Sequence, residues 1–305
     1  MELWLENGGL ITREAWERRI GQLRECAPAE YRTKEEAIVA VQEALIAAVT
    51  SRLPKRRFGI FFSAGVDSSL MALLAKQARA VFVCYTVGFH ENGMSFPADV
   101  LAAEAFAPRE QLVLRTRVFS LAEVEALVYR AVEILKPAGV FDAVIVTVAA
   151  VVLAAHSLAR ADDITEFFSG LGAEEIFAGY HRHRKAADVQ AECWRGLGAM
   201  WSRDLVRDAA VAAALGITVR TPFLDEQLIT AAMRVPAGLK INAQHKKIIL
   251  REAAAQLGLP PEIAWRRKLA AQYGSGFDKA LGKLARKRGF RTKGEYVGSL
   301  AGVLT

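Results

Sequence analysis

The sequence predicts an α/β protein, with a doubly wound parallel sheet followed by a mainly helical C-terminal half. Between residues 58 and 168, short apolar runs alternate with segments of helical periodicity, the order that builds a parallel sheet covered by helices on both faces. Beyond Gly179 strand signals nearly vanish, so the rest of the chain is expected to pack as helices beside the sheet. The 305 residues are 52% hydrophobic and 24% charged, the balance of an ordered globular protein.

The first predicted helix covers residues 34–52. Thr33 and Glu36 have the spacing of a capping box, and apolar residues then recur at helical intervals. Residues 58–62 form a short apolar run that ends in small residues, and residues 67–78 return to helical composition. This strand, tight turn and helix make up half of a βαβ unit.

The alternation continues along the chain. Strands are predicted at residues 80–87, 111–114 and 164–168, and helices at residues 98–106, 121–135, 143–155, 226–233 and 245–257. We expect three parts: an N-terminal helical segment (1–57), an α/β core (58–184), and a mainly helical part that completes the site and ends in a basic tail (185–305).

The apolar run at residues 143–155 raises the question of a membrane span. It is shorter than the ~20 residues that cross a bilayer, so we expect a helix buried inside the protein and no membrane association. Residues 1–7 already contain Glu2 and Glu6, which argues against a secretory signal. Three cysteines, an odd number without metal-ligand spacing, favour a reducing, cytoplasmic setting.

The net charge of +7 is concentrated near the C-terminus. Residues 266–293 hold ten lysines and arginines and one acidic residue, Asp278, so the remaining chain is slightly acidic. Such a tail can line a phosphate or nucleic-acid site. A solvated basic helix face explains it equally well, so the charge alone does not identify a partner.

The turn after residue 62 has the composition of a phosphate-binding loop. Ligands bind at the carboxyl ends of the strands in open parallel sheets. Here small residues lead straight into a helix, which places backbone N–H groups and hydroxyls around the positive end of the helix dipole. The loop consists of Ser63, Ala64, Gly65, Val66, Asp67, Ser68 and Ser69. It is neither a Walker A loop nor a GxGxxG motif. A purely structural strand-to-helix turn is the alternative interpretation.

This loop resembles the PP-loop, SGGxDSS, of the ATP pyrophosphatases, which split ATP between the α and β phosphates and hold the departing pyrophosphate. Residues 168–180 resemble the SGxGADExFxGY segment of the asparagine synthetase synthase domain, and the resemblance implies an adenine nucleotide alpha hydrolase-like fold. It also implies that Asp67 and Glu174 hold Mg²⁺ on the phosphates of ATP, a hard-oxygen site of the kind Mg²⁺ takes. An acid at a helix N-terminus is the alternative for Glu174.

Further motifs of this family follow in the right order. Residues 220–225 match RxPFLD, residues 247–252 match KxxLRE, and Trp265, Arg266 and Lys268 match WRxK. The resemblance therefore extends over roughly residues 35–274.

The resemblance implies roles for residues of these motifs. Lys247 and Arg251 of KxxLRE are implied to be catalytic, with Lys247 stabilising negative charge as a substrate carboxylate attacks the α-phosphate. A solvated lysine on a helix face is the alternative when Lys247 is considered alone. The implied nucleotide contacts beyond the first loop are Val87 and Gly88, which match the strand end that receives adenine, and Ser169 and Gly170 of the second loop.

The chain departs from the family at several positions. Glutamine-dependent synthetases carry an N-terminal amidotransferase whose nucleophile is a second-residue cysteine, whereas this chain has Glu2 and is too short to hold that domain. We therefore expect nitrogen from free ammonia, a separate glutaminase subunit or a different amine. Leu171 stands where the synthetases have a glutamate implicated in handling the nucleophile, and leucine can neither accept a proton nor bind an amine. Smaller departures are Ala64 for a loop glycine and Glu174 for aspartate.

Because of Leu171, together with AGYHRHR at residues 178–184 and QYGSG at residues 272–276, the chain resembles the asparagine synthetase domain-containing proteins more than true synthetases. The first hypothesis is an AMP-forming, ATP-dependent ligase that activates a carboxylate, aspartate by default, for attack by ammonia or another amine. The second is a PP-loop enzyme that adenylates a base of tRNA, which is less favoured because no catalytic cysteines lie near the loop. The third is an ATP-binding regulatory module without catalysis. Among the histidines, only His181 and His183 are candidates for ligand contact.

Overall fold

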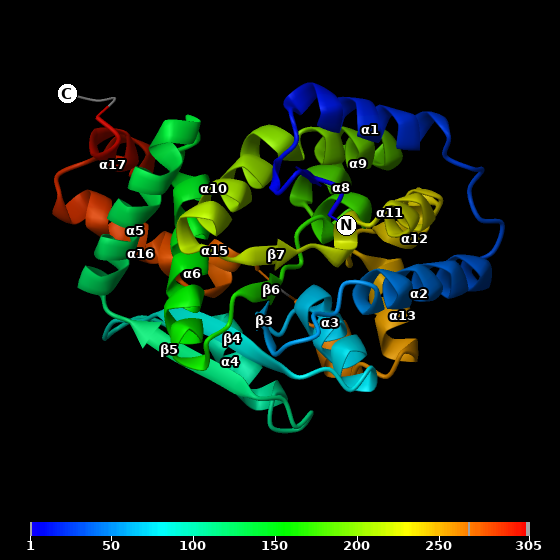
Figure 1. Ribbon diagram of the computed structural model, residues 1–305, viewed down its shortest axis with the longest axis horizontal. Coiled ribbons are helices and arrows are strands. Elements are labelled where there is room, and N and C mark those ends of the chain that lie inside the picture. Colours follow the sequence, from blue (N-terminus) through cyan, green and yellow to red (C-terminus); the bar gives the residue numbers. More distant parts are fainter. Residues whose placement is uncertain (1, 268, 303–305) are drawn as a thin grey trace.

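The computed structural model describes residues 2–267 and 269–302. Its centre is a five-stranded parallel sheet with the strand order β5-β4-β3-β6-β7 (Figure 1). The strands are β3 (Phe58–Phe61), β4 (Phe82–Phe89), β5 (Leu114–Phe119), β6 (Glu166–Phe168) and β7 (Thr218–Arg220). The chain extends the sheet from β3 to one side and then from β6 to the other, so the strand order reverses between β3 and β6.

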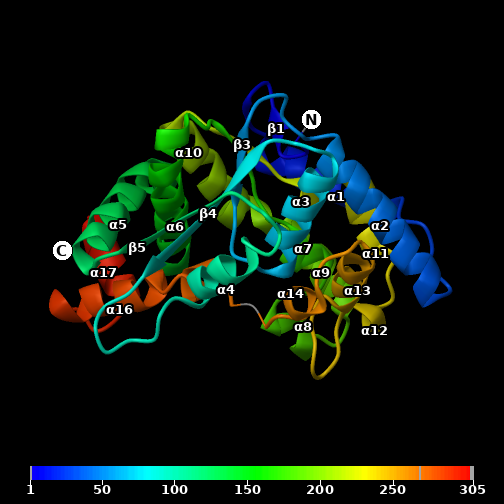
Figure 2. The same cartoon turned by 90° about the horizontal axis from the view of Figure 1, so that it is seen from below.

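Helices cover both faces of this sheet, as predicted (Figures 1 and 2). Phe167 and Phe168 are neighbours on β6, yet they belong to two different hydrophobic cores, because successive side chains of a strand point to opposite faces. The helices of the first half are α1 (Arg13–Glu25), α2 (Lys34–Thr50), α3 (Val66–Gln77), α4 (Ala98–Phe106), α5 (Leu121–Leu135) and α6 (Ala143–Ala159). The Phe168 core contains residues of α2 and α3, and the Phe167 core contains residues of α5 and α6.

The second half of the chain consists mainly of short helices. They are α7 (Ala173–Ile176), α8 (His181–Lys185), α9 (Val189–Gly198), α10 (Val206–Leu215), α11 (Glu226–Met233), α12 (Ala237–Lys240), α13 (Ile248–Gln256), α14 (Pro261–Ala264), α15 (Ala271–Gly274), α16 (Phe277–Lys287) and α17 (Lys293–Leu300). A π-helical turn, Trp201–Leu205, leads into α10. A small hairpin of β1 (Leu5–Glu6) and β2 (Gly9–Leu10) precedes α1.

Most predicted elements are confirmed, and α4, α5 and α11 have the predicted bounds. The strand predicted at 111–114 is wrong, because β5 begins where that prediction ends. β5 is an edge strand, and its exposed residues Arg115 and Arg117 alternate with half-buried ones, so it lacks the continuous apolar run of a central strand. The helix predicted at 245–257 begins only at Ile248.

One strand beyond Gly179 was not predicted. β7 has three residues, too few to give a distinct pattern, and it pairs with β6 through partners such as Phe167 and Val219. The predicted divisions of the chain at residues 57 and 184 stay predictions.

α6 together with the turn that follows it is longer than predicted. Ala143–Asp162 is 20 residues long and apolar enough to cross a membrane by length and composition, but half of it is buried inside the protein. Asp142 caps the start of α6 by accepting hydrogen bonds from the N–H groups of Val144 and Ile145. α6 packs against α5, β3 and β4, so it is the expected core helix.

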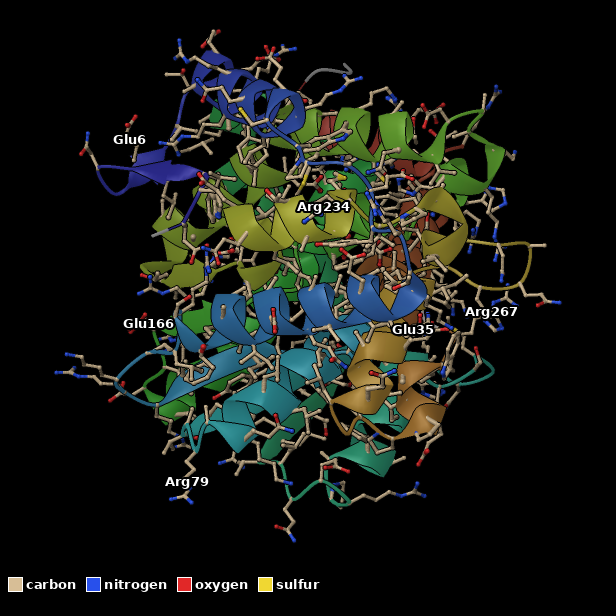
Figure 3. The ribbon with its side chains drawn as sticks, turned by 90° about the vertical axis from the view of Figure 1, so that its right-hand side faces the viewer. Glu6, Glu35, Arg79, Glu166, Arg234 and Arg267 are labelled. Atoms are coloured by element: carbon tan, nitrogen blue, oxygen red, sulfur yellow. The ribbon has the colours of Figure 1, made fainter. Side chains whose placement is uncertain are left out.

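The N-terminal segment is fastened to the other elements by a buried ion pair. Arg52, which follows α2, lies 3.2 Å from a carboxylate oxygen of Glu2 and 2.8 Å from Asp225. Glu2 also accepts a hydrogen bond from the N–H of Thr221. Figure 3 shows α2 running across this side of the molecule.

Candidate nucleotide-binding and active site

The candidate site lies where the strand order reverses. The first loop follows β3, and the second loop follows the neighbouring strand β6. Ligands of open α/β sheets bind in the crevice at such a point, beyond the carboxyl ends of the strands. The turn before α13 adds a third segment, because it brings Lys247 to the two loops.

Two serines hold the first loop in shape. The Ser68 hydroxyl oxygen lies 3.2 Å from the N–H of Ser63, from which it accepts, and the hydroxyl donates to the carbonyl of Gly65 at 3.3 Å. Gly65 is the N-cap of α3 and makes no side-chain capping bond, which leaves N–H groups of the first helical turn for an anion. Ala64 is buried with φ 49°, so this position does adopt the left-handed backbone that favours glycine.

The cluster at the centre of the site joins Asp67, Glu174 and Lys247. Nζ of Lys247 lies 2.8 Å from both carboxylate oxygens of Asp67 and 2.8 Å from Oε1 of Glu174. Lys247 and Asp67 are buried, whereas the Glu174 side chain is 28% exposed. Burial lowers the pKa of Lys247, but the carboxylates of Asp67 and Glu174 outweigh burial, so the pKa lies above its usual value. The side chain therefore remains a cation at neutral pH.

The backbone is specialised to allow this contact. Lys247 has φ 57°, and this left-handed residue is the reason why α13 begins one residue later. Gly179 packs so closely that a Cβ there would overlap the carboxylate of Glu174 and the Cε atom of Lys247. The glycine therefore leaves room for the close approach of these two side chains.

The Asp67 and Glu174 carboxylates fit a divalent cation. Their oxygens converge on one position, which Nζ of Lys247 occupies. Within residues 2–267 and 269–302, no group of three or more His, Cys, Asp or Glu side chains could hold a metal. Phosphate oxygens and water would have to complete the shell, which is the usual arrangement for Mg²⁺ on a nucleotide.

Arg266, from the WRxK motif, braces the first loop. Arg266 donates to the carbonyls of Ser63 (2.6 Å) and Ala64 (3.0 Å) and pairs with Asp99 (3.1 Å). Sequence reasoning matched Arg266 to a motif but gave it no role, because nothing local indicates a contact about 200 residues away. Lys268 of the same motif lies outside the described residues.

Arg251 is buried one helical turn after Lys247, and its guanidinium donates to backbone carbonyls. The acceptors are Lys246 (2.8 Å), Ala264 (2.5 Å) and Arg266 (3.1 Å). These contacts hold the segment that carries Arg266 against α13. The expected role of Arg251 in catalysis stays a prediction.

A cavity of about 210 Å³ opens beside the cluster. Several predicted ligand-binding residues line it, namely Ser63, Asp67, Ser68, Val87, Ser169, Gly170 and Glu174, together with Leu171. Gly88 does not belong to this lining: a Cβ there would lie 2.5 Å from Pro97 and 2.8 Å from Val100, so Gly88 allows α4 to pack closely. Ser69 is fully buried, and its hydroxyl has no hydrogen-bond partner among the described residues.

The histidine candidates lie apart from the cavity lining. His181 is exposed, whereas His183 is fully buried and its Nδ1 accepts a hydrogen bond from the N–H of Tyr180 at 3.0 Å. Burial lowers the pKa of His183 to about 4. His183 therefore packs neutral behind the second loop.

Part of the positive charge of the tail is paired with nearby acidic residues. Lys283 contacts Glu91, Arg288 contacts Glu125, and Lys293 contacts Asp278, each within 2.8 Å. Arg267, in contrast, is exposed at the edge of the molecule (Figure 3). This pairing favours the solvated-helix interpretation of α16 and α17.

Comparison with known proteins identifies the family of this chain. The family model described as asparagine synthase matches residues 40–192 and 184–293, which include both loops and the KxxLRE and WRxK segments. The chain belongs to the asparagine synthase family. A solved structure, the NMN synthetase of Francisella tularensis, aligns with a TM-score of 0.40 at 14% identity over 89% of this chain and 94% of that one.

Three named relatives are similar to parts of this chain. A Methanocaldococcus jannaschii protein, provisionally assigned as a glutamine-hydrolyzing asparagine synthetase, is 31% identical over 303 residues, covering 85% of this chain and 54% of the relative. Human asparagine synthetase is 32% identical over 234 residues (73% and 41%). An asparagine synthetase domain-containing protein of Saccharomyces cerevisiae is 37% identical over 111 residues (35% and 20%). The chain thus spans about half the length of the first two relatives.

Proposed function

We propose that this domain is an ATP-dependent, AMP-forming ligase that activates a carboxylate for attack by an amine. The observation that supports this most strongly is the position of Lys247, whose ammonium group lies between Asp67 of the phosphate loop and Glu174 of the second loop. A buried cation and two convergent carboxylates beside a helix N-terminus suit a reaction in which negative charge develops on a phosphate.

Different residues of the site bind the phosphates, the adenine and the metal ion. The first turn of α3 and the Ser63 and Ser68 hydroxyls bind the β and γ phosphates, and adenine lies against Val87 at the end of β4. Asp67 and Glu174 would hold Mg²⁺, which neutralises phosphate charge when bound. Arg266 positions the loop through the carbonyls of Ser63 and Ala64.

The proposed reaction has two chemical steps. A carboxylate oxygen of the substrate attacks the α-phosphorus, the bond to the β-phosphate oxygen breaks, and pyrophosphate leaves. The amine nitrogen then attacks the acyl carbon, AMP departs with the acyl oxygen, and the nitrogen loses its excess proton. Lys247 stabilises the negative charge that develops in both steps, because its ammonium group is desolvated and already aimed at the cluster.

Aspartate is the proposed carboxylate by analogy with the relatives, and ammonia or another amine is the proposed nucleophile. A separate glutaminase subunit could supply the ammonia.

The products of ATP turnover test the proposal. The protein is incubated with Mg²⁺, ATP, aspartate and ammonium, and the nucleotides are separated by chromatography. We expect AMP and pyrophosphate, lost in Asp67→Asn and retained in Asp163→Asn, an exposed control position between α6 and β6. ADP with phosphate, or no turnover with any carboxylate, would contradict the ligase assignment. AMP formation that requires tRNA would favour the tRNA-modifying alternative.

A further inference from the structure

One wall of the cavity has features that the proposed mechanism does not use. Arg207 and Asp208, at the start of α10, line the same cavity as Asp67, Glu174 and Leu171. Their side chains are 7% and 12% exposed, so both are largely desolvated. They are held by the scaffold of α10, which packs against α5 and α6.

The charge of Arg207 is already matched by its neighbours. Its Nε lies 2.7 Å from Oδ1 of Asp208, and its Nη1 lies 3.1 Å from Oδ1 of Asp204. Two carboxylates therefore face one guanidinium. A third carboxylate, from a substrate, would find the positive charge of Arg207 already neutralised by Asp204 and Asp208.

Asp208 is the less satisfied of the two acids. Both oxygens of Asp204 accept hydrogen bonds, from Arg207 and Arg203. Within the part of the chain that the structure describes, no hydrogen bond reaches Oδ2 of Asp208. Burial raises the pKa of Asp208 and Arg207 opposes this, as for a carboxylate that lacks full solvation.

Part of the cavity lining is apolar. Val148, Val151, Val152 and Leu171 supply apolar surface to the cavity. A carboxylate that faces apolar surface gains most from a ligand that brings hydrogen-bond donors and positive charge.

We infer that Asp208 binds an amino group of a substrate, with Leu171 and the α6 valines packing around the attached carbons. The inference rests on the proposed function for the reaction, but the binding itself needs no turnover. Two substrates carry an amino group that Asp208 can bind: the acceptor, when it is an amino acid such as aspartate, and the amine nucleophile.

Binding assays with Mg²⁺ and the non-cleavable analogue α,β-methylene ATP distinguish them. The probes are L-aspartate, methylammonium, and succinate, which is aspartate without its amino group. Their binding is measured by calorimetry on wild type, Asp208→Asn and the exposed control Asp163→Asn. We expect Asp208→Asn to weaken binding of an amine at least tenfold, about 1.4 kcal/mol. We also expect succinate to bind equally well or better, because Arg207 loses one neutralising partner. Loss of aspartate binding assigns the site to the acceptor, and loss confined to methylammonium assigns it to the nucleophile.

A second pair of variants keeps the test valid if Asp208→Asn does not fold. Leu171→Lys places an ammonium group in the same wall and should exclude the amine, whereas Leu171→Met should retain it. Unchanged amine binding in Asp208→Asn or in Leu171→Lys, or binding of neither amine by wild type, would overturn the inference. AMP formation with normal amine binding in Asp208→Asn removes this inference alone, and Asp208-dependent binding without AMP formation removes the proposed function alone.

Discussion

Replacing Lys247 by methionine removes the ammonium group that Asp67 and Glu174 both contact while preserving most of the side-chain volume. Asp67 is only 3% exposed, so its carboxylate would be left in a largely desolvated position. Removing one partner of a buried ion pair costs roughly 3–5 kcal/mol. Glu174 adds less, because its side chain is 28% exposed and water can solvate it. At roughly 2 °C per kcal/mol for a domain of this size, the melting temperature should fall by roughly 6–10 °C.

The same variant tests whether Nζ and a metal ion compete for one position. Since Nζ lies between the two carboxylates, millimolar Mg²⁺ without nucleotide should stabilise Lys247→Met more than wild type. Scanning calorimetry with and without Mg²⁺ measures both effects, and Lys287→Met, an exposed position on α16, is the control. A melting temperature within 2 °C of wild type, or an equal response of both proteins to Mg²⁺, would refute this reasoning.

Three further predictions concern the surroundings of the cluster. Gly179→Ala should weaken binding of a fluorescent ATP analogue at least tenfold, because the new Cβ overlaps Glu174, while Gly198→Ala, which has no atom within 4 Å of the added Cβ, should bind normally. Arg266→Ala should weaken nucleotide binding roughly tenfold, because its hydrogen bonds to the first loop are lost. An equal loss of nucleotide affinity in Arg267→Ala, an exposed neighbour, would show that only the positive charge matters and not these hydrogen bonds. Because the pKa of His183 is lowered in the folded protein, this histidine takes up a proton at a higher pH in the unfolded chain than in the folded one. The free energy of unfolding should therefore fall as the pH is lowered from about 6.5 to about 4. Urea unfolding across that range should show a decline that is roughly 2 kcal/mol smaller in His183→Asn, and an identical decline would contradict the assignment.

The parts of the fold that could be predicted are those with local signals. The N-cap residues Thr33, Asp142 and Asp225 each accept hydrogen bonds from the first turn of their helix, and each of these helices begins within one residue of the predicted position. The phosphate loop could be predicted for the same reason, since its small residues, the αL position of Ala64 and the start of α3 lie within seven residues.

Features that depend on distant contacts could not be predicted. The left-handed backbone of Lys247 is accompanied by contacts with Asp67 and Glu174, and nothing in the local sequence indicates it. The roles of Arg266 and Asp208 likewise depend on which loop or cavity wall lies opposite. β5 was misplaced because its edge position, and therefore its alternating exposure, follows from the strand order of the whole sheet.

The start of α13 connects the chemical and the positioning residues of the site. Lys247 and Arg251 are one helical turn apart, so they move together with the helix. Lys247 reaches the carboxylate of Asp67, while Arg251 holds the carbonyls of Ala264 and Arg266. Arg266 in turn holds the carbonyls of Ser63 and Ala64, at the other end of the same phosphate loop. A displacement of α13 would therefore disturb both ends of the loop at once, which explains how a loop with alanine in a left-handed position can keep one shape: contacts from outside the loop fix it where its own backbone preference does not.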